Sequence, residues 1–277
     1  MRSKFLMILA LTGVAGIAWK ARAENHASKG LRHYGAAQKV GNGRARTYLV
    51  VDSITGNPVE VGVALDSAAL EGLSTSGTVA VPGHEHHDSY ILTLPAANGT
   101  PYQFVELNWN PKGHGGPYTA PHFDFHFYRI PVAERNAIDP TTPEGAERAA
   151  RLPTSEELPA GYVSSHLLMK LTPAQASVPK MGLHWLDMNS PELPPQNHPF
   201  TSTFIVGSWD GRVIFDEPMI TRDFILAQRT NPAAIEIALP AAQRYTPAGF
   251  YMNGYRISYD PTTAEYRIAL TGLGWRE

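Results

Sequence analysis

Residues 121–129 read PHFDFHFYR and alternate aromatic and polar side chains without a break. Because successive side chains of a β-strand point to opposite faces, this period of two predicts a strand with two unlike faces. One face carries Phe123, Phe125 and Phe127 and is expected to seal a hydrophobic core. The other face carries His122, Asp124, His126 and Tyr128. Exposed strands more often present Thr, Lys or Glu, so two imidazoles around a carboxylate indicate a functional face, and both groups are common metal ligands.

The geometry of a strand limits how these polar residues can act together. Neighbours on one face are roughly 6.8 Å apart, so His122 and His126 are about 13–14 Å apart on an unbulged strand. An ion such as Zn²⁺ needs each ligand atom within roughly 2.0–2.2 Å. Either His122 with Asp124 or Asp124 with His126 could therefore share an ion, with further ligands from elsewhere. The third residue would then support the ligands or face a substrate, unless a bulge gathers all three.

Two residues in the second half of the chain are the best candidates for these further ligands. His184 lies in MGLHW and Glu217 in FDEPM, each flanked by apolar residues that suggest burial. A buried imidazole or carboxylate is costly without a partner or an ion, so we expect both to complete a divalent-metal site, most simply for zinc and alternatively for manganese or iron. A metal-free hydrogen-bond network, such as His184 paired with Asp124, is the alternative. Pro218 is expected to place Glu217 at a sheet edge or a bulge.

Histidines are concentrated in the first half of the chain. Six of the eleven lie between residues 84 and 126. Strands that follow one another along the chain usually lie side by side, so these histidines are expected to gather at one end or face of a sheet. His86, His87 and His114 are therefore further site candidates, although the segment 84–87 reads equally well as a solvated loop.

The first 23 residues have the pattern of a secretory signal peptide. A basic start is followed by an apolar run over 5–19 and by Ala-Arg-Ala at 21–23, which makes Glu24 the expected mature N-terminus. The apolar run is shorter than the roughly 20 residues that a membrane span needs. We therefore expect an exported protein, periplasmic or secreted, with no integral membrane segment after processing.

Composition excludes several functions. The chain has no cysteine, which rules out thiolate metal sites, a cysteine nucleophile and iron–sulfur clusters. With 23 basic and 25 acidic residues and no basic run beyond the leader, it lacks the electrostatic pattern of a nucleic-acid-binding protein. The expected partner is a small-molecule ligand or substrate, and a homo-oligomer is possible.

Turn and strand signals predict a mainly β (α+β) fold. Residues 24–43 are expected to form a flexible leader, and residues 44–277 a single β-rich domain. Hairpins are expected at 48–51 with 59–64, at 200–209 with 212–220, and at 255–259 with 265–270. A proline-rich stretch at about 132–179 reads as a helical insertion that packs over the sheet. The sum predicts an antiparallel β-barrel or sandwich with a small helical insertion.

Four blocks of the sequence carry a family resemblance: LNWNPKGH, PHFDFHFY, MGLHW and FDEPMIT. They resemble the signature blocks of an exported bacterial family of unknown function, over roughly residues 44–228. The resemblance implies an exported, β-rich, oligomer-prone domain, and it implies no particular activity or substrate.

Two classes of function fit these observations. In a metal-dependent hydrolase or lyase, the ion would activate a water or polarise a carbonyl, while Glu217 or the spare histidine moves the proton. The alternative is a non-catalytic envelope protein that binds a metal or small ligand or has a structural role. An open coordination position beside a pocket would indicate the enzyme, and a closed shell would indicate binding. Asp124 and Glu217 could also form the carboxylate pair of a glycosidase.

Overall fold

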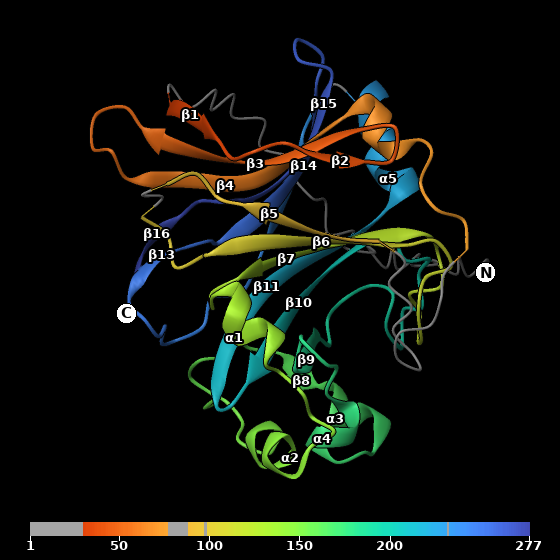
Figure 1. Ribbon diagram of the computed structural model, residues 1–277, viewed down its shortest axis with the longest axis vertical. Coiled ribbons are helices and arrows are strands. Elements are labelled where there is room, and N and C mark those ends of the chain that lie inside the picture. Colours follow the sequence, from red (N-terminus) through yellow and green to blue (C-terminus); the bar gives the residue numbers. More distant parts are fainter. Residues whose placement is uncertain (1–29, 77–87, 97–98, 232) are drawn as a thin grey trace, which may run out of the picture.

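The computed structural model describes residues 30–76, 88–96, 99–231 and 233–277 (Figure 1). The predicted signal peptide, the expected mature N-terminus and the histidines at 84, 86 and 87 lie outside the described residues. No helix within these ranges is both long enough and apolar enough to cross a membrane.

Two antiparallel sheets, each of seven strands, pack face to face as a sandwich (Figure 1). The first has the order β1-β3-β4-β15-β14-β12, with β2 paired to β3. Its strands are β1 (Gly30–Tyr34), β2 (Gln38–Val40), β3 (Gly43–Asp52), β4 (Pro58–Asp66), β12 (Ile235–Ala238), β14 (Gly254–Asp260) and β15 (Glu265–Thr271). Of the two architectures that the sequence predicts, the sandwich is therefore right and the barrel is not.

The second sheet has the order β5-β6-β7-β11-β10-β9-β8. Its strands are β5 (Asp88–Thr93), β6 (Phe104–Asn110), β7 (His122–Tyr128), β8 (Tyr162–Ser164), β9 (Leu183–Asp187), β10 (Ser202–Trp209) and β11 (Arg212–Thr221). A separate pair is formed by β13 (Gly249–Tyr251) and β16 (Gly274–Arg276). The three predicted hairpins are present as β3–β4, β10–β11 and β14–β15.

The main hydrophobic core lies between the two sheets. It joins aliphatic residues of the first sheet, such as Val63 and Ile268, to the aromatic face of β7. Phe123, Phe125 and Phe127 are each 0% exposed, which confirms that this face of the predicted strand seals a core.

Short helices cover the other face of the second sheet. They are α1 (Val132–Asn136), α2 (Pro143–Ala149), α3 (Ser165–Met169) and α4 (Pro173–Ala176), all on the side away from the first sheet (Figure 1). A second apolar cluster packs Ile138 and Ala149 of this stretch against Tyr128 and Phe215 of the sheet. The polar side of β7 is therefore enclosed in protein and does not face water.

Side-chain caps explain where several helices begin. Thr142 accepts a hydrogen bond from the backbone N–H of Gly145 at the start of α2. Thr221 caps α5 (Arg222–Ala227) in the same way, and Asp66 caps the 3₁₀ turn η1 (Ser67–Leu70). A further 3₁₀ turn, η2 (Gln228–Thr230), follows α5 directly.

Two sequence predictions need correction. The described part of the expected leader is not loose, because β1 and β2 pair with β3 and so become part of the first sheet. Glu217 is not at a sheet edge, because β11 lies between β7 and β10. On the β7 side, residues 217 and 218 of β11 have no paired residue, although the pairs on either side of them are present. On the other side, Pro218 pairs with Phe204 of β10. A proline lacks the backbone N–H, and the side of the strand where the pairing is interrupted needs none at this position.

Candidate metal centres

The outer face of the second sheet collects polar side chains from β6 and β7. Glu106 of β6 lies opposite His126, Asn108 opposite Asp124, and Asn110 opposite His122. All six residues are buried. Polar groups at this depth need hydrogen-bond partners, opposite charges or an ion.

The structure divides the predicted donors into two groups. The first group, called here the sheet group because all its members are strand residues, consists of His126, His184 and Glu217. The second, called the loop group because His114 lies on the β6–β7 loop, consists of His114, His122 and Asp124. Within each group, one candidate ligand atom per residue lies within 4.8 Å of the others. His122 and His126 therefore belong to different groups, as the strand spacing requires.

One expectation about the grouping is wrong. We expected two of the three polar residues of β7 to join His184 and Glu217, but only His126 does. Asp124 lies one same-face step along the strand, roughly 6.8 Å away, where it meets His122 instead. His114, a further candidate from the sequence, completes that second group.

A glycine on the intervening strand lets His184 reach the sheet group. Gly207 of β10 pairs with His184 on one side and with Phe215 on the other. A Cβ at Gly207 would lie 2.0 Å from Phe215 Cε1, so the ring occupies the space that any other residue would fill. The centroid of this ring lies 4.8 Å from that of His126 and 5.6 Å from that of His184. Sequence reasoning missed this support, although a glycine inside a strand is a known signal of close approach.

The electrostatics of the sheet group favour a cation. Burial raises the pKa of Glu217 well above its usual range, and the negative charges of Asp124 and Glu106 raise it further. Glu106 forms an ion pair with Arg135. A divalent ion beside Glu217 would offset both the burial and the neighbouring charges.

One distance between donor atoms of the sheet group is close to that between two ligands of one metal ion. His126 Nε2 and Glu217 Oε1 are 3.5 Å apart, which is longer than the roughly 2.7–3.2 Å of an N–H···O hydrogen bond. Two ligands bound tetrahedrally at roughly 2.0–2.1 Å from Zn²⁺ are about 3.3 Å apart. The second oxygen, Glu217 Oε2, has no hydrogen-bond partner in the part of the chain that the structure describes.

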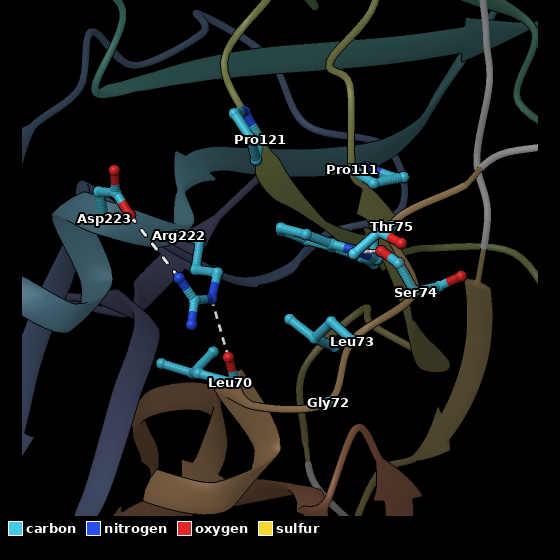
Figure 2. Close-up of a pocket in the computed structure, with 10 residues that line it drawn as sticks. Leu70, Gly72, Leu73, Ser74, Thr75, Pro111, Pro121, Arg222 and Asp223 are labelled. Atoms are coloured by element: carbon cyan, nitrogen blue, oxygen red, sulfur yellow. Dashed lines mark hydrogen bonds and ion pairs between the residues drawn. The ribbon is translucent and has the colours of Figure 1, made fainter.

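A cavity of about 290 Å³ lies between the segment that follows η1, the ends of the β6–β7 loop and the start of α5 (Figure 2). Its wall is largely apolar and includes Leu73, Trp109 and Pro121, with the guanidinium of Arg222 at one side. Arg222 Nε donates a 2.8 Å hydrogen bond to the carbonyl oxygen of Leu70 (Figure 2). None of the residues that line this cavity is a donor of the sheet group or the loop group.

Fold and site together define a mainly β sandwich with two histidine–carboxylate groups at the outer face of one sheet, all of whose donors are buried except His114. Residues 55–109 match a family model described as TTHB210-like, hypothetical protein TTHB210. Comparison with curated proteins and with solved structures gives no match. The matched segment ends at Trp109 in β6, so similarity to this family of unknown function covers none of the donors of either group.

Proposed function

We propose that the protein binds a divalent transition-metal ion at the sheet group, with zinc as the first candidate and manganese or iron as alternatives. The observation that carries the proposal is the 3.5 Å distance between His126 Nε2 and Glu217 Oε1 inside a buried set of two imidazoles and one carboxylate. This ligand chemistry suits zinc, manganese and ferrous iron.

The metal-free alternative fits the geometry less well. A hydrogen-bond network would join Glu217 to His126 by a proton, but the 3.5 Å between His126 Nε2 and Glu217 Oε1 is longer than the usual roughly 2.7–3.2 Å of such a bond. The suggested pairing of His184 with Asp124 also fits less well, because a ligand atom of His184 lies with those of His126 and Glu217. An ion between the three would satisfy each of them and compensate the carboxylate charge.

Burial supports binding over catalysis. His126 is 1% exposed, Glu217 2% and His184 9%, so the ion would be enclosed. The three ligands come from β7, β9 and β11, and an ion that joins them would link strands across the second sheet. We therefore propose a non-catalytic role in which the ion stabilises the sandwich, as structural zinc sites stabilise other folds.

A metal-dependent hydrolase or lyase is the second candidate function, and one observation supports it. Three protein ligands leave a tetrahedral position for water, which is the pattern of catalytic zinc sites. The ion would lower the pKa of that water. Metal-dependent turnover of ester, phosphate or glycoside substrates that is lost in Glu217→Gln would favour the enzyme.

Metal analysis of purified mature protein tests the proposal. We expect wild-type protein to retain zinc after dialysis, and His184→Ala and Glu217→Gln to lose one ion per chain while keeping a native circular dichroism spectrum. His198→Ala is the matched control because His198 is exposed and belongs to neither group. Wild-type metal content in both site variants would contradict the proposal.

A further inference from the structure

We infer that the loop group is a second, separate metal site, whose ion exchanges with solution faster than the ion of the sheet group. The inference goes beyond the proposed function because it uses a different set of donors: His114, His122 and Asp124.

The orientation of His122 prepares one nitrogen for a metal. Its Nδ1 lies 2.7 Å from the carbonyl oxygen of Ala120. A carbonyl oxygen only accepts, so Nδ1 must carry the proton, and in the neutral ring Nε2 presents a lone pair. A hydrogen bond from the remote ring nitrogen to a carbonyl is the usual support of a metal-bound histidine.

That lone pair faces an acceptor across a short gap. His122 Nε2 lies 3.2 Å from Asp124 Oδ1, and both residues are buried. Despite this distance, His122 Nε2 has no hydrogen-bond partner among the residues described. Two lone pairs this close in a buried place repel each other, and either a second proton on His122 or a metal ion beside both atoms would remove the repulsion. Their 3.2 Å separation is close to the edge of about 3.3 Å expected between two zinc ligands.

The carboxylate is held in place by a neighbouring amide. Asn110 Nδ2 donates a 2.8 Å hydrogen bond to Asp124 Oδ2, so the other oxygen, Oδ1, is the one nearest His122. Asn110 lies opposite His122 in the β6–β7 pair, where the backbone fixes its position. A metal-binding carboxylate is commonly oriented by such a hydrogen bond.

The third donor comes from the loop between β6 and β7. Gly113 has a φ of +64°, which turns the chain, and the backbone N–H of His114 donates to the carbonyl of Tyr118 at 3.0 Å. This places the His114 ring edge-on to His122, with 4.7 Å between centroids. The rings of Tyr118 and Phe200 contact these histidines and make the surroundings apolar.

The two sites differ in how readily an ion can leave. His114 is partly exposed and lies on a loop, whereas all three ligands of the sheet group are buried strand residues. Displacement of the β6–β7 loop would detach His114 from the loop group, whereas the sheet group lies on the face covered by the helical stretch of residues 132–179 (Figure 1). Local opening of a loop costs less free energy than opening of elements packed on a core, so the loop ion should leave first.

Zinc titration of the full mature chain, followed by release to a coloured chelator, tests the inference. Wild type should bind two ions per chain, one for each group, and release them in a fast and a slow phase. His114→Ala should lose one ion and the fast phase. Glu217→Gln should lose the other ion and the slow phase, and His198→Ala should behave as wild type. His114→Gln serves as a second variant if the alanine form does not fold.

The outcomes separate this inference from the proposed function. If both His114 variants still bind two ions, the second site is refuted. The second site is also refuted if the wild type binds a single ion that only Glu217→Gln removes, and in that case the proposed function still holds. A single ion removed by His114→Ala and kept by Glu217→Gln would support the loop site and refute the sheet site. Wild-type protein that binds neither zinc nor manganese nor ferrous iron would refute both.

Discussion

Replacing Gly207 by alanine should destabilise the protein and weaken metal binding at the sheet group, although Gly207 is not a ligand. The added Cβ would lie 2.0 Å from Phe215 Cε1 and 2.1 Å from Cζ. Carbon atoms pack at about 3.5–4.0 Å, so from 2.0 Å the ring must move by about 1.5 Å. The backbone is no obstacle, because the φ of Gly207 is not in the left-handed region.

The magnitude follows from what surrounds the ring. Phe215 is fully buried and contacts both His126 and His184. Overpacking of this kind costs about 1–3 kcal/mol of unfolding free energy. Site geometry must be held to about 0.5 Å, so a ring shift three times as large should move the imidazoles out of position. Loss of such supporting contacts lowers metal affinity by about 10–100-fold.

Urea unfolding measured in chelator and again in excess zinc separates the two effects. Gly274→Ala is the matched control, because a Cβ on this strand glycine meets nothing within 4 Å, and its cost should stay within about 0.5 kcal/mol. Adding Phe215→Leu to Gly207→Ala should recover part of the loss, since it removes the clashing ring atoms. A Gly207→Ala protein with wild-type stability and zinc affinity would refute the reasoning.

Three further predictions concern the core, the leader and acid stability. Phe125→Ala should cost about 3–5 kcal/mol in urea unfolding because Phe125 is 0% exposed, whereas Ile54→Ala, at a position 92% exposed, should cost under about 0.5 kcal/mol; equal costs would contradict the core. Intact-mass measurement of exported protein should give a chain that starts at Glu24, and a mass that includes residues 1–23 would show that the leader is retained. Hydrogen bonds from Thr55 and Ile54 lower the pKa of Asp52 in the folded protein. The ionised Asp52 therefore stabilises the fold at pH values above its unfolded pKa of about 3.9, and this stabilisation is lost as the pH falls through the lower pKa of the folded state. An NMR titration of Asp52 with a midpoint at or above about 3.9 would exclude this.

Local patterns in the sequence were enough to predict much of the fold. The alternation over residues 121–129 predicted the strand and its buried aromatic face, because the period of two is a property of any extended backbone. The hairpin predicted at 200–209 with 212–220 is present, and its connecting residues, Asp210 and Gly211, both have positive φ, as a type I′ turn requires.

The sequence also indicated how some of the candidate donors are divided. The separation of His122 and His126 along one strand is set by covalent geometry, so it could be predicted that they fall in different donor groups. Glu217 and His184 could be chosen as partners because apolar neighbours implied burial of a polar group. The local signal at Pro218 was misleading, because a proline is compatible with an inner strand where the ladder is interrupted.

Only the tertiary structure decided which donors meet and what encloses them. His184 lies near His126 because the strand order β7-β11-β10-β9 places both in one sheet and Gly207 leaves space between them for the Phe215 ring. His114 lies near His122 because the β6–β7 loop folds back onto the sheet. The helices of residues 132–179 cover this face and turn an apparent surface into an interior (Figure 1). Strand order and the packing of an insertion depend on contacts between residues distant in sequence, which no local period encodes.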